Sequence, residues 1–494
     1  MAKALKSKKL LVWTKSDVRR NVTVYLLNAI IIAGLFVLSI YTNSLSGGIG
    51  LLEYFKNSYQ EMLVFFVLSA LLVTVMALYF YNEERDFMKN AGSSEMIFFI
   101  MELSLIVCYA LGKYVNVYLR PLVLPALIVM FLGSRRSAVF VNIIFSLLMF
   151  LTDVFVGELI GLEQFSSLFV GITAGTVAIF FTSKIYSRFK LITFSLLISI
   201  PTVLSMLMIR LVNGWDGIVA DVMCSICMGP ASVMLFLIFL PIMEAIFKRI
   251  SCFNLAELTD HKAKLIKRLI KEAPGTFNHS IVVSNIAEAC ATAIGEDALL
   301  ARTCAYYHDI GKLRRPEFFG ENQTEGINPH DELVPELSTN IIKAHAQDGY
   351  NLVLKNRLPQ EIADVCIQHH GTMPILYFYH KAKKFTDGEV DINQYCYTGP
   401  KPQSKIAAII MIADGCEAAA RTIKDRSREK VSEVVRKLVN ERMELGQFDE
   451  CEITIKELNI IIHTVTNNLT GIYHKRIKYP KVNLDGVQDN KEEI

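Results

Sequence analysis

The feature that most constrains this chain is a series of long apolar segments that fills its first half and stops near Phe247. A helix needs roughly 20 mainly apolar residues to cross a bilayer. Beyond Phe247, charged and helix-forming residues return at ordinary density. The sequence therefore predicts a multi-pass helical membrane domain, over residues 21–247, followed by a soluble domain. About eight spans are expected, over residues 21–41, 61–81, 96–112, 117–132, 137–156, 165–182, 191–211 and 222–247.

The composition favours a membrane protein, because 52% of the residues are hydrophobic and only 20% are charged. The formal net charge is only +3, and no basic stripe with interleaved aromatic residues is present. Nucleic acid is therefore not an expected partner. The lipid bilayer is an expected partner. The sequence leaves the oligomeric state open, with a homodimer among the options.

The charges between the apolar segments predict the orientation of the chain, since basic residues are enriched in cytoplasmic loops. With the basic N-terminus (residues 1–20) inside, the basic loops fall inside and the acidic loops outside. Eight crossings return the chain to the cytoplasm at Lys248. We therefore expect a multi-pass protein of the cell membrane with a cytoplasmic soluble half. The basic loops carry Arg135, Arg136, Lys184, Arg188 and Lys190, and the acidic loops carry Glu158, Glu163, Asp216 and Asp221.

The soluble half is predicted to be helical, because its apolar residues recur at intervals of three and four. A linker helix is expected over residues 248–273 and a helical domain over residues 274–475. The charged stretch over residues 476–494 is expected to be disordered. The predicted fold class of the whole chain is all-α.

Histidines and acidic residues continue the apolar faces of several of these helices; His308, for example, follows Leu300 and Cys304 on one face. Burying an ionisable group without a partner is costly. A single histidine on an apolar face is usually a core residue with a hydrogen-bond partner. Seven such groups on successive helices instead indicate a shared metal centre. They are His279, His308, Asp309, His345, His369, His370 and Asp414.

The motifs around these residues resemble those of the HD phosphohydrolase superfamily, since His308 and Asp309 are followed by Ile-Gly-Lys. Longer segments, with the multi-pass domain ahead of them, resemble the bacterial seven-transmembrane HD-domain phosphodiesterases that degrade cyclic di-AMP. The resemblance covers roughly residues 60–475. The segments read AYYHDIG (305–311), NPHD (328–331), QHHG (368–371), GPKPQ (399–403) and IIMIAD (409–414).

The resemblance implies a dinuclear metal site in an HD-superfamily domain. One ion would be held by His279, His308 and Asp414, the other by His345, His369 and His370, and Asp309 would bridge them. Mixed imidazole and carboxylate ligands suit Mn²⁺ or Fe²⁺ better than Zn²⁺. Two such ions activate a water to hydroxide and clamp a phosphodiester. The implied activity is hydrolysis of cyclic di-AMP to the linear dinucleotide pApA.

Charged residues near the HD dipeptide are candidates for contact with the substrate. Lys312 could meet a phosphate oxygen and act in catalysis with Asp309, or it could be a solvated surface lysine; both interpretations are open. Arg315 and Lys401 are weaker phosphate-binding candidates. Gly311 is expected to end the helix that carries His308.

A second His-Asp pair, His330 and Asp331, lies after Asn-Pro and lacks the Gly-Lys that follows the first. We interpret His330 as a loop residue or a support of the site. Three departures from the family pattern bear on regulation and substrate preference. The loop 42–60 stands where the family has a large extracytoplasmic domain, Asn278 where many members have a second histidine, and Ile406 where many have a glutamate.

Other functions compete with this prediction. A cyclic di-GMP phosphodiesterase of the HD-GYP type should carry Gly-Tyr-Pro after the paired histidines, where this chain reads Gly371-Thr372-Met373. A nucleotidase or alarmone hydrolase usually needs only the H…HD…D set, so the extra histidines count against it. A membrane receptor whose HD domain only binds ligand would not need a centre that activates water.

Overall fold

The computed structural model describes residues 15–472, except for residues 48–50, 85–91, 157–158, 160, 183–184, 324–327, 386–388, 424 and 426. Several predictions lie outside the described residues. They concern the N-terminus up to residue 14, Glu158, Lys184 and the tail over residues 476–494.

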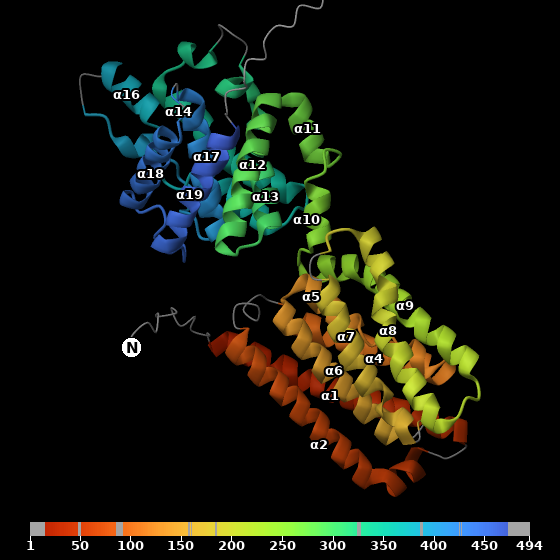
Figure 1. Cartoon of the computed structure of the whole chain (residues 1–494). Coiled ribbons are helices and arrows are strands. Elements are labelled where there is room, and N and C mark those ends of the chain that lie inside the picture. The colour runs from red at the N-terminus through yellow and green to blue at the C-terminus, as the bar shows by residue number, and fades with distance from the viewer. Residues whose placement is uncertain are drawn as a thin grey trace, which may run out of the picture. The chain divides into compact units, whose positions relative to one another are not determined.

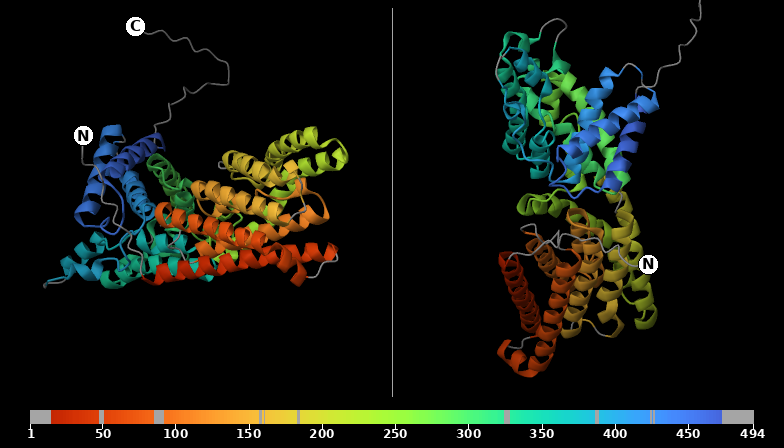
Figure 2. Two further views of the ribbon diagram at one scale, coloured as in Figure 1. Left: turned by 90° about the horizontal axis from the view of Figure 1, so that it is seen from below. Right: turned by 90° about the vertical axis from the view of Figure 1, so that its left-hand side faces the viewer.

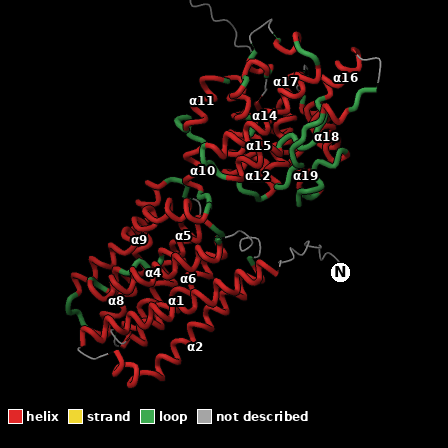
Figure 3. The backbone as a smooth tube through the Cα atoms, turned by 180° about the vertical axis from the view of Figure 1, so that it is seen from behind, coloured by secondary structure: helices red, strands yellow, loops and turns green. Residues whose placement is uncertain are grey.

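The described residues form helices joined by loops, in two compact units that divide the chain at Asn254 and Leu255. Figure 3 shows helices joined by loops throughout the described part of the chain. The β interaction found among the described residues is an isolated bridge between Pro374 and Cys396. The predicted all-α fold class is confirmed.

In the first unit, seven helices are long and apolar enough to cross a membrane (Figure 1). A core of aliphatic and aromatic side chains joins them, and α1 and α2 lie side by side (Figure 2). The seven are α1 (Lys15–Gly47), α2 (Leu51–Glu83), α4 (Ser93–Tyr114), α6 (Arg135–Val156), α7 (Ser166–Thr182), which follows the 3-10 turn η2 (Gly161–Phe165), α8 (Arg188–Asn213) and α9 (Ile218–Phe247).

The fourth predicted span, over residues 117–132, differs from one continuous helix. It forms the 3-10 turn η1 (Val117–Leu119) and the nine-residue helix α5 (Leu124–Leu132). Nine helical residues extend about 14 Å, less than half of a bilayer's hydrocarbon core. Its apolar character reflects burial among other helices, since Leu127 and Ile128 are fully buried. The count of eight crossings stays a prediction.

A buried ion pair joins the segments around α5. The Arg120 guanidinium lies 2.6 Å from Asp153 Oδ1 on α6 and donates to Ser167 Oγ on α7 at 3.0 Å. Gly112 on α4 provides the space for it, because an added Cβ would lie 2.1 Å from Arg120 Nε.

We therefore expect Gly112→Ala to destabilise the first unit by about 1–3 kcal/mol, the usual cost of overpacking. The melting temperature of the full chain in detergent measures the effect. Gly34→Ala on α1 is the matched control, because nothing lies within 4 Å of an added Cβ there. Equal melting temperatures for the two variants would contradict this account of Gly112.

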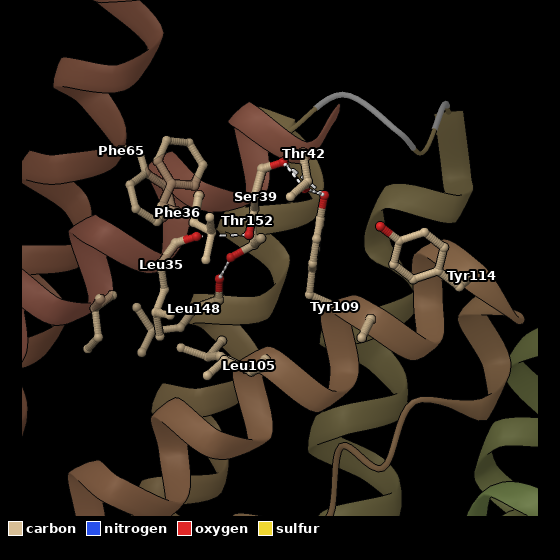
Figure 4. Close-up of a pocket in the computed structure, with 14 residues that line it drawn as sticks. Leu35, Phe36, Ser39, Thr42, Phe65, Leu105, Tyr109, Tyr114, Leu148 and Thr152 are labelled. Carbon is tan, nitrogen blue, oxygen red and sulfur yellow. Dashed lines mark hydrogen bonds between the residues drawn. The ribbon is translucent and has the colours of Figure 1, made fainter. Parts of the chain in front are cut away.

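A mainly apolar pocket of 190 Å³ lies between α1, α2, α4 and α6 in the same unit (Figure 4). Its polar groups bond to one another: the Tyr109 hydroxyl donates to Ser39 O and lies 2.9 Å from Thr42 Oγ1. Such internal pairing is what a bilayer environment requires of buried polar groups.

The second unit packs its helices around a large apolar core, with a smaller apolar cluster around Phe378 and Tyr395. Figures 1 and 2 show the arrangement of the helices. Its helices are α11 (Lys264–Glu272), α12 (Pro274–Ile294), α13 (Ala298–Tyr307), α14 (Pro335–Lys355), α15 (Gln360–Gln368), α16 (Leu376–Phe385), α17 (Lys405–Thr422), α18 (Arg428–Glu444) and α19 (Ile455–Ile472). Short 3-10 turns connect them: η3 (Ile310–Arg314), η4 (Pro316–Phe318), η5 (Gly320–Asn322), η6 (Pro329–Glu332) and η7 (Ile392–Tyr395).

The predicted linker helix over residues 248–273 is wrong as a single element. The structure has α10 (Cys252–Leu258), a turn, and then α11. Leu265, Ile266 and Leu269 of α11 are buried in the core of the second unit. The charged residues of α11 are therefore the solvent face of a core helix rather than the sign of a free linker.

Candidate metal centre

Five helices of the second unit bring all seven predicted ligands together. His279 lies on α12, His345 on α14 and Asp414 on α17, whereas His308 and Asp309 follow the end of α13. His369 and His370 follow the end of α15. The seven side chains form two groups whose ligand atoms lie within 4.8 Å of one another. One group is His279, His308 and Asp414, and the other is Asp309, His345, His369 and His370.

Asp309 stands between the two groups. Its Oδ2 lies 3.2 Å from His308 Nε2 and 3.7 Å from His279 Nε2. Its Oδ1 lies 3.3 Å from His345 Nε2 and 3.6 Å from His369 Nε2. Each oxygen of one carboxylate therefore faces a different group.

In three of the imidazoles, the nitrogen that does not face Asp309 is fixed by a hydrogen bond. Nδ1 of His308 donates to Ala305 O at 2.7 Å, Nδ1 of His345 to Ile342 O at 2.5 Å, and Nδ1 of His369 to Cys366 O at 2.9 Å. This leaves each Nε2 with its lone pair directed at Asp309. Such backbone bonds orient metal-ligating histidines in proteins.

Glu417, one turn after Asp414 on α17, does the same for His279. Its Oε2 accepts a hydrogen bond from His279 Nδ1 at 2.6 Å, and its side chain is buried. Burial alone would lower the pKa of His279, but hydrogen bonds to Asp414 and Glu417 outweigh burial and raise it to about 9. Glu417 is not among the residues predicted from the sequence.

The donor set fits divalent metal ions on a direct structural test. His308 Nε2 and Asp309 Oδ1 are fully buried and have no hydrogen-bond partner among the described residues. Unpaired buried polar atoms are rare because they are costly. Both are good ligands for first-row divalent metals. Ions bound to the two groups would satisfy both atoms.

Lys312 is not a solvated surface lysine. Its ammonium lies 2.7 Å from Asp309 Oδ2 and 2.8 Å from Glu321 Oε1, and its side chain is 12% exposed. Burial alone would raise the pKa of Asp309, but Lys312 and His308 outweigh it and hold this pKa well below the ordinary value. Asp309 is therefore a carboxylate rather than a carboxylic acid. Glu321 is not among the residues predicted from the sequence.

The weaker substrate candidates lie outside the cluster. Arg315 is exposed after η3, and Lys401 lies 3.3 Å from Asp449 Oδ2. His330 is buried and lies 2.9 Å from Phe318 O through its Nε2, so it supports a turn and is not among the clustered ligands.

The prediction that Gly311 ends the helix is wrong, because α13 ends at Tyr307 and Gly311 lies within η3. An added Cβ would lie 1.9 Å from His345 O and 2.5 Å from Gly349 N. The absence of a side chain therefore lets η3 approach α14, which places Asp309 beside His345.

Glu417→Gln should weaken metal binding about 10- to 100-fold, the usual cost of losing a carboxylate that orients a ligating histidine. Equilibrium dialysis against Mn²⁺ measures the change. Glu417 also accepts a hydrogen bond from Arg421 at 2.7 Å. Arg421→Gln is thus the control, and an equal loss in that variant would contradict the role assigned to the contact with His279.

The fold and the site define a multi-pass membrane protein with a helical domain that carries a His/Asp cluster able to hold metal ions. Two family models match the chain. The model described as "7TM receptor with intracellular HD hydrolase" matches residues 59–251, and the model of the HD domain matches residues 276–419. Together the two matches show the membrane domain of the family of 7TM receptors with an intracellular HD hydrolase, followed by an HD domain. The HD domain also implies binding of divalent metal.

Curated relatives agree with this family. The chain is 34% identical over 444 residues to "Cyclic-di-AMP phosphodiesterase PgpH" of Bacillus subtilis, which covers 86% of this chain and 61% of that protein. It is 47% identical over 241 residues to the protein of the same name in Listeria monocytogenes, over 49% of this chain and 33% of that protein. The chain thus spans less than two thirds of either relative.

A solved structure is also similar: the HD domain of L. monocytogenes phosphodiesterase PgpH in complex with cyclic di-AMP. The identity is 48%, the match covers 44% of this chain and 99% of that one, and the TM-score is 0.42.

Proposed function

We propose that this chain is a membrane-anchored phosphodiesterase that hydrolyses cyclic di-AMP to linear pApA. The observation that carries the proposal is the position of Asp309, whose two oxygens face two separate groups of metal-ligand side chains. Both curated relatives bear the name of this activity. A site for two ions is the arrangement that phosphodiester hydrolysis uses in many enzymes.

The proposed ligand assignment follows the two groups. His279, His308 and Asp414 would hold one ion and His345, His369 and His370 the other, with Asp309 shared, and Mn²⁺ or Fe²⁺ is the proposed metal. When bound, two such ions would supply a water of lowered pKa and neutralise charge on the phosphoryl oxygens.

The chain's own residues hold this site in position. Lys312 fixes the Asp309 carboxylate with one of the three N–H donors of its ammonium and Glu321 takes a second. We propose that the third donor meets a phosphoryl oxygen of the substrate, so that Lys312 contacts both the bridging carboxylate and the substrate. The hydrogen bonds to Nδ1 keep the imidazoles turned toward Asp309.

We propose that the HD domain lies in the cytoplasm. The described basic residues Arg135, Arg136, Arg188 and Lys190 flank membrane helices where cytoplasmic loops are expected. An even number of crossings is needed to place both the N-terminus and the HD domain in the cytoplasm. Seven helices among the described residues are long enough to cross, so this proposal requires the segment over residues 117–132 to provide the eighth crossing. A homodimer is one option for the assembly of this chain, and the proposed function does not depend on it.

The purified protein with Mn²⁺ or Fe²⁺ should cleave cyclic di-AMP in preference to cyclic di-GMP. We expect this preference because the relative from Bacillus subtilis bears the name of a cyclic di-AMP phosphodiesterase. In addition, the chain reads Gly371-Thr372-Met373 where an enzyme of the HD-GYP type carries Gly-Tyr-Pro. Chromatography of the products at matched substrate concentrations measures the two rates. Equal rates, or faster cleavage of cyclic di-GMP, would refute the assigned base preference.

A further inference from the structure

The metal centre opens into a pocket of about 270 Å³. One side of the pocket is formed by His369, His370 and Asp414 of the centre, and another by Arg442 of α18. The Tyr397 ring stacks on His370 with centroids 4.3 Å apart. The remaining wall is apolar, with Met373, Pro374, Ile375 and Met411.

Arg442 is an unusual residue for this position because its charge is buried without an acidic partner. Its side chain is only 9% exposed, and its Nε is buried with no hydrogen-bond partner. Nη1 donates to Leu438 O at 3.0 Å on the same helix. Among the described residues, no carboxylate forms an ion pair with it. A buried cation of this kind is costly unless an anion compensates it.

The surrounding backbone holds Arg442 in place. An added Cβ on Gly415, the residue after Asp414, would lie 2.1 Å from Arg442 Nη2, so the guanidinium packs directly over α17. Gln447, which follows α18, accepts a hydrogen bond from Thr372 N at 3.0 Å. This bond ties the end of α18 to the loop after His370. The guanidinium is thus fixed relative to the metal centre.

This inference rests on the proposed function, because cyclic di-AMP carries two phosphodiesters in one ring. When one of them lies at the metal centre, the ring keeps the other one close to it, within reach of the pocket wall. A guanidinium presents a planar fork of donors that matches two phosphate oxygens. We propose that Arg442 forms a second phosphate subsite, which binds the phosphodiester that is not being cleaved.

The test compares Arg442→Met and Arg442→Lys with the wild-type full chain, purified in detergent and loaded with Mn²⁺. Arg442→Met should raise KM and Kd for cyclic di-AMP about 10- to 100-fold, as the loss of a charged hydrogen bond does. Arg442→Lys, which keeps the charge but not the fork, should lie between. The loss should be much smaller on bis(p-nitrophenyl) phosphate, which has one phosphate. Arg436→Met, an exposed arginine on the same helix, controls for net charge.

Each outcome decides between this subsite and its alternatives. Unchanged KM and Kd in Arg442→Met, or equal losses on both substrates, would overturn the subsite while wild-type turnover of cyclic di-AMP still supported the proposed function. A fall in melting temperature with normal substrate binding would mean that Arg442 only stabilises the end of α18. A wild-type protein that neither binds nor cleaves cyclic di-AMP would contradict the proposed function and the subsite together.

Discussion

Asp309→Ala is expected to abolish phosphodiesterase activity, with a loss of at least about 10³-fold, and to reduce the metal content of the protein. The carboxylate faces both sets of ligands, at 3.2 Å from His308 Nε2 and 3.3 Å from His345 Nε2. Without it, the two ions lose their shared ligand and their fixed separation. Initial rates and metal analysis on the same preparation measure both effects.

The second His-Asp pair supplies the matched control for this substitution. Asp331 is exposed and lies outside the cluster, so Asp331→Ala should keep its metal and its rate. The melting temperature of Asp309→Ala must also be followed, because Lys312 loses its closest partner there. Wild-type turnover in a folded Asp309→Ala protein would refute the two-metal hypothesis.

His345→Ala should lower the rate by at least about 10²-fold while leaving one ion per chain, as the loss of a positioned charge does. His345 belongs to only one of the two groups, so His279, His308, Asp309 and Asp414 remain to hold the other ion. Alanine is a good helix former, so the substitution within α14 should not disturb the helix. Metal stoichiometry and single-turnover rates measure the result.

The competing interpretation is that His345 is only a core histidine. His330→Ala represents that case, because His330 is equally a buried histidine bonded to a backbone carbonyl but lies outside the cluster. The control should lose stability and keep its metal. If His345→Ala behaved in the same way, with two ions and full rate per folded molecule, its assignment as a ligand would be wrong.

The sequence predicted much of the candidate centre because the chemistry of metal binding restricts residue type. Histidine and aspartate are costly to bury on otherwise apolar helix faces unless a shared partner such as a metal ion compensates them. All seven predicted ligands converge in the structure. Glu417 was within reach of the same reasoning, since it follows Asp414 by three residues and shares its helix face. It was missed because it lies outside the motifs that carried the family resemblance.

Other features had no signal in the sequence. Glu321 meets Lys312 from a separate 3-10 turn, and Arg442 meets the pocket from α18, so neither has a fixed spacing from the HD dipeptide. The division of residues 117–132 into η1 and α5 also had no signal, because burial among helices and exposure to lipid select the same apolar residues. The charged helix α11 was predicted to be part of a linker because most of its residues are charged. Its buried face consists of only three apolar residues, Leu265, Ile266 and Leu269.

Metal content and turnover, measured on one sample of the intact protein loaded with Mn²⁺, test the central claim most directly. We predict two ions per chain, conversion of cyclic di-AMP to linear pApA, and a rate that falls in step with metal as a chelator removes it. One ion per chain at full rate, or two ions per chain with no cleavage of cyclic di-AMP, would contradict the claim.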